Sequence, residues 1–101
     1  MRRKMAAGNW KMNGSVPALD MIGTLADAHA DEICDIVICP PAHLLSAASN
    51  IAAEGPVAIG AQNCHAAEKG AHTGDISAAM VADTGARYVI TGHSERRAAY
   101  G

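Results

Sequence analysis

The sequence lacks phenylalanine altogether, and its 101 residues include only one tryptophan and two tyrosines. It also lacks an excess of positive charge, because 8 Lys and Arg stand against 10 Asp and Glu, for a net charge of −2. We therefore expect neither a nucleic-acid partner nor an anionic membrane surface. No apolar run approaches the roughly 18 residues of a membrane span, and no signal-type core follows the basic N-terminus. These absences predict an intracellular protein.

Cysteine is scarce and odd in number, and Cys34, Cys39 and Cys64 include no CxxC spacing. The simplest interpretation is three reduced, mostly buried thiols. Because His65 follows Cys64, a metal site and a catalytic thiol remain as weaker alternatives, although adjacent ligands point in diverging directions. We expect no metal and no cofactor.

Half of the residues are apolar and 18% are charged, a balance that excludes a disordered or collagen-like chain and suits one small domain. Four short apolar runs predict β-strands at 5–8, 36–39, 57–60 and 88–91. None of the runs alternates strictly with polar residues. Continuous apolar strands are expected when both faces of a parallel sheet are covered.

Helical patterns separate these strands. The first begins with Ser15 as a candidate N-cap and Pro17 just inside the helix. The second ends at the breaker formed by Gly55 and Pro56, and Ser77 can cap the third. The predicted buried faces consist of Leu19, Ile22, Leu25, Ala26 and His29 in the first helix and Leu44, Leu45, Ala48, Ile51 and Ala52 in the second. The order β-α-β-α-β-α-β predicts an α/β domain with parallel strands and right-handed crossovers.

Polar side chains follow the predicted strands at the points where the strands end. Asn9 and Lys11 follow the first strand, Asn63 the third, and His93 and Glu95 the fourth. Because α/β folds place their chemistry beyond the carboxyl ends of the strands, we expect these residues on one rim. Lys11 can hold a phosphate, polarise a carbonyl or simply be solvated. His93 can act as acid, base or hydrogen-bond donor, or merely satisfy a helix end.

The connection after the third strand is unusually long. It carries no helical or strand pattern between Gln62 and Asp75. Loops of this length in small domains are usually functional or contact a partner.

Four blocks of sequence then point to one family. They are AGNWKMNG at 7–14, GAQN at 60–63, GAHTGDIS at 70–77 and YVITGHSERR at 88–97. In content, order and spacing they resemble the triosephosphate isomerase family over nearly the whole chain. The resemblance implies an α/β fold of the (β/α)8 barrel type. Residues 1–101 would supply its first half, strands one to four, with no second domain.

The resemblance also implies an activity. Members of the family interconvert dihydroxyacetone phosphate and glyceraldehyde 3-phosphate through an enediol(ate), as cytoplasmic enzymes of glycolysis and gluconeogenesis. By position, His93 is implied to be the electrophile that donates to the substrate oxygens. Lys11 is implied to supply positive charge, and Asn9 to line the substrate pocket. Glu95 is implied to support Lys11 and His93 rather than to act as the base.

A homodimer is implied as well, with the long loop at its interface. Thr73 resembles the residue that reaches across to Asn9 of the partner subunit. Met12 resembles the side chain that sits inside the partner's loop, and Arg96 resembles an Arg that pairs with an acid across the interface. Asp75 stands where many members carry Glu, and its side chain is one methylene shorter.

The family barrel has eight β/α units in about 250 residues, and its catalytic base is a Glu after a later strand. We therefore expect the 101-residue chain to carry half of the site and to be inactive alone. Small side chains such as Ala7, Val37, Ala58 and Ile90 are expected to face the barrel interior. Two alternatives remain open, a non-catalytic, self-associating half-barrel module and a different phosphate-binding α/β enzyme.

Overall fold

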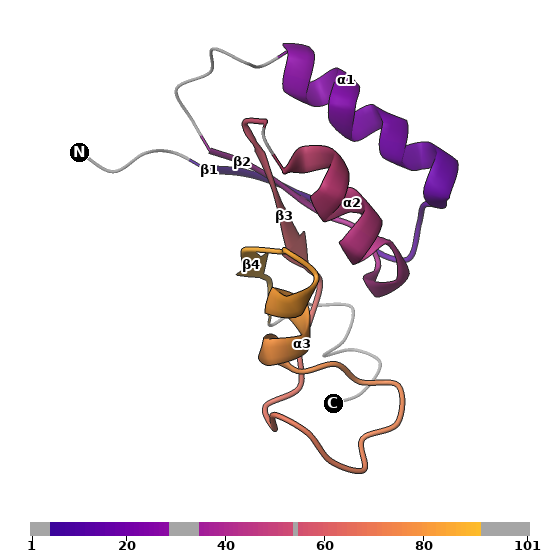
Figure 1. The fold of residues 1–101 in the computed structure, drawn as a ribbon, viewed down its shortest axis with the longest axis vertical. Helices are drawn as coiled ribbons and strands as arrows, with labels where there is room; N and C mark the ends of the chain where they lie inside the picture. The colour runs from indigo at the N-terminus through magenta and orange to yellow at the C-terminus, as the bar shows by residue number, and fades with distance from the viewer. Residues whose placement is uncertain (1–4, 29–34, 54, 92–101) are drawn as a thin grey trace, which may run out of the picture.

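The computed structural model describes residues 5–28, 35–53 and 55–91, which form one parallel sheet with its two longest helices packed on one face (Figure 1). In spatial order the strands are β1 (Met5–Asn9), β2 (Asp35–Cys39), β3 (Val57–Ala61) and β4 (Tyr88–Val89). The helical segments are the 3-10 helices η1 (Val16–Leu19) and η2 (Ala42–Leu44) and the α-helices α1 (Asp20–Ala28), α2 (Leu45–Ala52) and α3 (Ala78–Asp83). Each strand pairs in parallel with the next, which confirms the predicted element order.

The register of the sheet separates its residues into two faces. Ile36 pairs with Val57, and both belong to the core beneath α1 and α2. One residue further along, Val37 pairs with Ala7 on one side and Ala58 on the other. Because successive strand residues point to opposite faces, this row lies on the face away from the helices. Three of the four predicted interior residues thus share one face, and Ile90 lies just beyond the end of β4.

The core lies between the sheet and the two helices. Its largest fully buried side chains include Leu19, Ile22, Leu44 and Leu45. Burial of one such side chain contributes about 1.5–3 kcal/mol. The prediction that Ile51 belongs to this buried face is wrong, because its side chain is 48% exposed. The buried positions of α2 recur every three or four residues from Leu45, and Ile51 lies beside that stripe.

The N-terminal ends of the helices differ in which groups accept hydrogen bonds from their free backbone amides. The Ser77 hydroxyl accepts a hydrogen bond from the Met80 amide at 3.2 Å, which confirms Ser77 as an N-cap. The Ser15 side chain makes no capping bond. The chain enters α1 through the 3-10 helix η1, in which the Ala18 amide donates to the Ser15 carbonyl at 3.0 Å. His29 lies outside the described residues.

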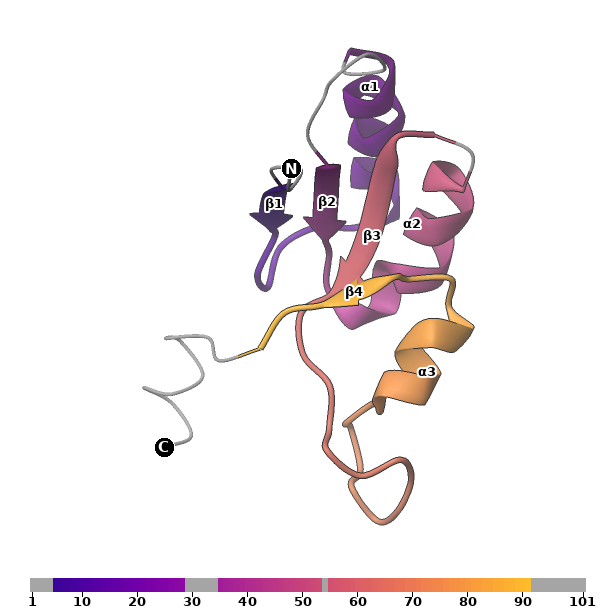
Figure 2. The same cartoon turned by 90° about the vertical axis from the view of Figure 1, so that its left-hand side faces the viewer.

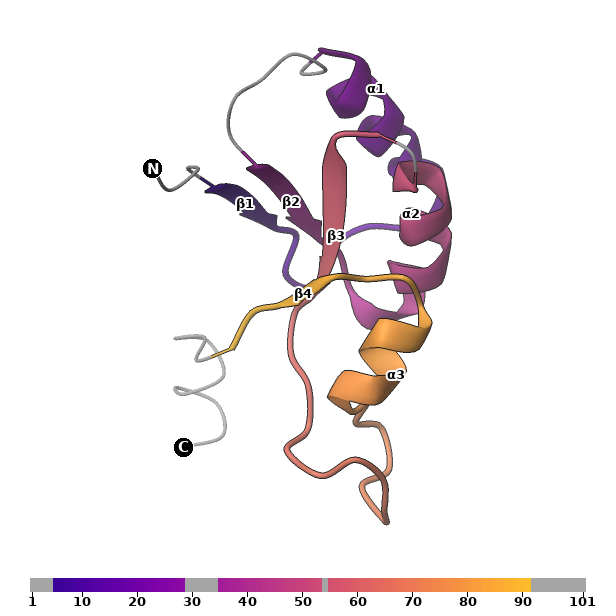
Figure 3. The ribbon, with the colours of Figure 1, turned by 60° about the vertical axis from the view of Figure 1, so that its left-hand side comes forward.

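The fourth strand is shorter than predicted. Its ladder covers Tyr88 and Val89, although the Ile90 amide still donates to the Ala61 carbonyl at 2.9 Å. Figure 2 shows β1, β2 and β3 running side by side in one direction. Figure 3 shows the long loop after β3 extending beyond their carboxyl ends. No helix within the described ranges is long and apolar enough to cross a membrane.

Candidate functional site

The turn after β1 holds Lys11 in an uncommon backbone conformation. Its φ is +57°, in the left-handed region that residues other than glycine rarely adopt. This conformation costs roughly 1–2 kcal/mol. The Lys11 amide donates to Oδ1 of Asn9 at 2.8 Å, so the last residue of β1 stabilises the turn that follows it.

A side chain from the end of β3 anchors the same turn. Nε2 of Gln62 donates to the Lys11 carbonyl at 2.7 Å and to the Cys39 carbonyl at 2.9 Å. The Trp10 amide also donates to the Cys39 carbonyl, at 3.0 Å. The ends of β1, β2 and β3 are therefore tied together around the backbone of Lys11. Strain at a single residue persists only when its surroundings over-determine it, and this arrangement meets that condition.

Gln62 is the site residue that sequence reasoning missed. The available signal was its position, because an amide directly after a predicted strand lies on the same rim as Asn9 and Lys11. A primary amide carries two N–H donors, and it can therefore bridge two neighbouring strand ends. Which carbonyls it reaches depends on the three-dimensional approach of the strands, which the sequence does not display.

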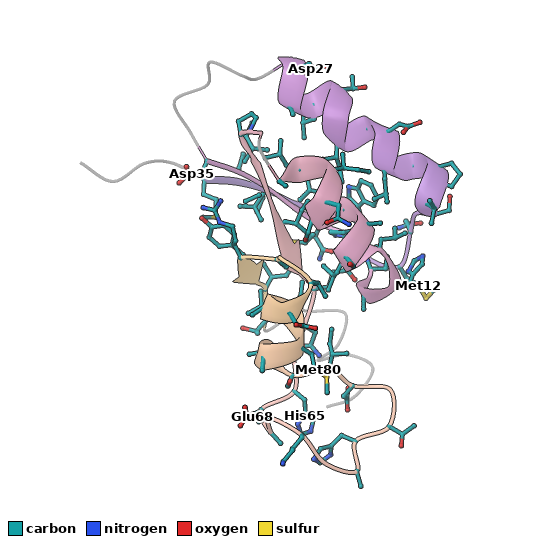
Figure 4. The ribbon with its side chains drawn as sticks, viewed as in Figure 1. Met12, Asp27, Asp35, His65, Glu68 and Met80 are labelled. Carbon is teal, nitrogen blue, oxygen red and sulfur yellow. The ribbon has the colours of Figure 1, made fainter. Side chains whose placement is uncertain are left out.

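The far end of the turn is held by packing. Trp10 packs against the core, and Nδ2 of Asn13 donates to the Trp10 carbonyl at 2.9 Å. Gly14 has a φ of +111°, and a Cβ there would lie 2.9 Å from Cε3 of Trp10. The Met12 side chain is 94% exposed, and Figure 4 shows it projecting well away from the loop that carries His65. Of the two neighbours of Lys11, Trp10 is thus half-buried against the core and Met12 points outward.

Two cysteines lie near the site in different environments. Cys39 is buried at the end of β2, where a Cβ on Gly60 would lie 2.9 Å from its Sγ. Burial raises the pKa of the Cys39 thiol, and a hydrogen bond with the Gly60 backbone partly offsets that effect. Cys64, in the loop after β3, is only half-buried, and both thiols are free. Over the three described ranges, no group of three His, Cys, Asp or Glu could hold a metal ion.

The loop spanning residues 62–77 is irregular, as predicted, except for one bridge between His65 and Ser77. The His65 amide donates to the Ile76 carbonyl at 2.7 Å, which closes the base of the loop. Nearer the tip, the Asp75 amide donates to the His72 carbonyl at 2.9 Å. The predicted partner contacts Thr73 and Asp75 are both exposed.

The rim therefore contains part of the predicted site. Asn9 and Lys11 are brought together, and Asn63 follows β3 at the same edge of the sheet. His93, Glu95 and Arg96 lie outside the described residues. The observed part of the site is a lysine in a rigidly held turn at the carboxyl edge of a parallel sheet, the edge at which such folds bind ligands.

Comparison of the sequence with known proteins identifies the family of this chain. The family model described as triosephosphate isomerase matches residues 4–101. The chain belongs to the triosephosphate isomerase family. The triosephosphate isomerase of Ruegeria pomeroyi is 59% identical over 101 residues, which are 100% of this chain and 40% of that protein. The one from a Jannaschia species is 52% identical, over 100% of this chain and 41% of that protein.

A solved structure gives the same result for the fold. The crystal structure of triosephosphate isomerase from Bartonella henselae matches with a TM-score of 0.93 and 44% identity, covering 98% of this chain and 41% of that one. The four parallel strands are therefore the first part of an α/β barrel of the triosephosphate isomerase type, as predicted. The chain spans about 40% of the length of the curated relatives it matches.

Proposed function

We propose that this chain is the N-terminal part of a triosephosphate isomerase subunit. The proposed reaction is the interconversion of dihydroxyacetone phosphate and glyceraldehyde 3-phosphate through an enediol(ate). The observation that carries the proposal is Lys11, whose left-handed backbone is held by Asn9 and Gln62 at the carboxyl edge of the sheet. A turn fixed in this way keeps the ammonium attachment point stationary, and pre-organised charge is what stabilises an anionic transition state.

Each predicted site residue then has a proposed role. Lys11 supplies positive charge to the phosphate and to the developing oxyanion, and Asn9 lines the pocket beside it. His93 donates a hydrogen bond to the substrate carbonyl and hydroxyl oxygens. Glu95 supports Lys11 and His93 and is not the base.

The base and further phosphate contacts are proposed to come from strands beyond these four. This proposal is supported by the share of the relatives that the chain spans, about 40%. An apolar hollow of about 390 Å³ beside α1, lined by Trp10, Met21, Leu25 and Ile38 among others, is also open to accept another element. We infer that the 101-residue chain alone is inactive, because proton abstraction needs a positioned base.

The proposed working form is a cytoplasmic homodimer without a cofactor. In that form Met12 inserts into the partner's long loop, Thr73 reaches the partner's Asn9, and Asp75 and Arg96 form polar contacts across the interface. The 94% exposure of Met12 supports this role, because so large an apolar side chain gains about 2 kcal/mol when a partner buries it.

Replacing Lys11 by alanine in the complete subunit tests the proposal. The expected result is a loss of kcat/KM of about 10²–10³, the usual effect of removing one pre-organised donor from a developing oxyanion. His93→Ala is expected to have an effect on kcat of similar size. Arg87→Ala is the matched control, because this exposed cation lies at the amino end of β4, away from the rim. A Lys11→Ala enzyme with less than about a fivefold loss, on the scale expected for such a donor, would contradict the proposed role.

A further inference from the structure

Two imidazole rings from opposite arms of the loop at 62–77 lie against each other. The rings of His65 and His72 are stacked, with centroids 3.8 Å apart and an interplanar angle of 25°. At this separation the two ring faces are in van der Waals contact. His65 lies near the base of the loop, where Figure 4 places it close to Glu68 and Met80. The stack therefore joins the base of the loop to a residue seven positions further along the chain.

The turn that carries Thr73 is connected to the base of the loop at both of its ends. This turn forms where the Asp75 amide donates to the His72 carbonyl at 2.9 Å. Its carboxyl end continues directly into Ile76, whose carbonyl accepts from the His65 amide at 2.7 Å. Its amino end is His72, and the ring of that residue lies on the ring of His65. The backbone bonds hold one end of the turn, and the stack holds the other.

The backbone around the stack fits the two rings. Gly70 has a φ of +143°, and a Cβ there would lie 3.2 Å from both Cδ2 and Nε2 of His72. Glycine at this position therefore leaves room for the ring. On the other side of the stack, Nδ1 of His65 accepts from the Ala67 amide at 2.9 Å, which orients that ring. Each ring is thus held in a defined position by its own arm of the loop.

Burial contributes little to the order of the outer part of the loop. Residues 66–75 are all exposed except Ala67, which is half-buried. Segments with few buried contacts open most easily, and a partner that binds such a segment bears the cost of ordering it. A stacked aromatic pair favours the joined arrangement by roughly two- to twelvefold, on the scale measured for such pairs. The stack therefore orders the turn before a partner binds.

We propose that His65 and His72 are positioning residues that hold the turn carrying Thr73 in the shape that a second copy of this chain binds. The inference rests on the proposed function, in which this loop lies at the interface of a homodimer. The chain also carries an apolar group for such a contact, because the Met12 side chain is 94% exposed. Figure 4 shows Met12 projecting away from the loop that carries His65, so the two meet only between copies. A two-fold dimer makes that contact twice.

His72→Leu in the complete subunit tests the proposal, because leucine keeps an apolar side chain and loses the flat ring. The dimer dissociation constant is measured by dilution of fluorescently labelled protein at pH 8, where free imidazole is uncharged. Since the dimer contains the loop twice, we expect this constant to rise by about five- to a hundredfold. His72→Phe keeps a flat ring and is the matched control, with a constant expected within about twofold of the unmodified value. A rise of less than about twofold in His72→Leu, or an equal rise in His72→Phe, would overturn the proposal.

A double-mutant cycle separates positioning from direct contact with the partner. In His65→Asn, Oδ1 can accept from Ala67 in place of Nδ1, but the stacking ring is gone. This variant is expected to weaken the dimer about as much as His72→Leu does. Adding His72→Leu to it should then weaken the dimer by less than about threefold more, because the stack is already lost. If His72→Leu has its full effect in the His65→Asn background, His72 acts through the partner directly and the positioning role is wrong.

The same measurements distinguish this inference from the proposed function on which it rests. An unmodified complete subunit that stays monomeric at micromolar concentration would contradict the proposed homodimer and this inference together. A dimer that resists both His72→Leu and His65→Asn would overturn the inference and leave the proposed homodimer standing. Far-UV circular dichroism of each variant checks the fold, and we expect the spectrum of His72→Leu to be unchanged because His72 is exposed.

Discussion

The turn at residues 10–14 and the loop at 62–77 both follow strands at the same edge of the sheet, yet they are held in different ways. The turn is anchored from outside itself, through Gln62 to the Lys11 and Cys39 carbonyls and through Trp10 to the core. The loop is braced mainly by its own residues, through the bonds from His65 to Ile76 and from Asp75 to His72 and through the stacked rings.

This difference matches the work proposed for each segment. A charge that stabilises a transition state must stay in place, and anchoring to three strands supplies that rigidity. Most residues of the loop at 62–77 are exposed or half-buried, and segments with few buried contacts are the ones that open most easily. The same edge of the sheet thus carries a rigid segment beside an adaptable one.

The largest effect on this contrast is expected from Gln62→Ala, which removes the two side-chain hydrogen bonds that tie the turn to the ends of β2 and β3. Two neutral hydrogen bonds contribute about 0.5–1.5 kcal/mol each, so kcat/KM of the complete subunit should fall by about ten- to hundredfold. Gln62→Glu keeps the shape and loses the N–H donors, and it is expected to do at least as much damage. Both effects are measured by steady-state isomerase kinetics. A loss in kcat/KM below about twofold in Gln62→Ala would show that the turn holds itself.

Replacing one glycine in each segment by alanine gives a matched pair of smaller losses in stability. Gly14 and Gly74 both have positive φ, +111° and +94°, so alanine is strained at either position. Only at Gly14 does the new Cβ meet the core, 2.9 Å from Trp10, whereas nothing lies within 4 Å at Gly74. Gly14→Ala is therefore expected to lower the free energy of unfolding by about 1–2 kcal/mol more than Gly74→Ala. Urea denaturation of the complete subunit measures the difference, and equal losses would contradict the packing argument.

The smallest expected effect is a difference in thiol reactivity between Cys39, at the end of β2, and Cys64, in the loop at 62–77. Cys39 is buried and its thiol has a raised pKa, so less of it is thiolate at neutral pH, while Cys64 is half-buried in the loop. In a Cys34→Ala background, Cys64 should react with a thiol reagent faster than Cys39, because Cys39 is buried and the thiolate is the reactive form. Raising the pH should speed the Cys39 reaction, because more of its thiol is then ionised. Faster labelling of Cys39 near neutral pH would contradict the burial argument.

Much of the fold could be predicted from local patterns. The four apolar runs, the Ser77 cap and the helical steps around Leu45 and Ala48 are properties of neighbouring residues. The structure has a strand at each run, although the fourth is shorter than expected, and it has the cap and the buried helical steps where expected. Ser15 lies at the predicted N-cap position, although its side chain makes no capping bond, and the prediction for Ile51 is wrong because it is exposed. For Ile51 the outcome depended on which neighbouring element packs against α2, which a periodic pattern does not specify.

The sequence by itself determined the parallel α/β order, the placement of Asn9 and Lys11 at one rim, and the family, because strand runs, turn residues and motif blocks are written along the chain. Only the tertiary structure decided that Gln62 holds the Lys11 backbone and that His65 lies against His72. The physical reason is the separation along the chain. Gln62 and Lys11 are 51 residues apart, and their contact exists only because β1, β2 and β3 end side by side.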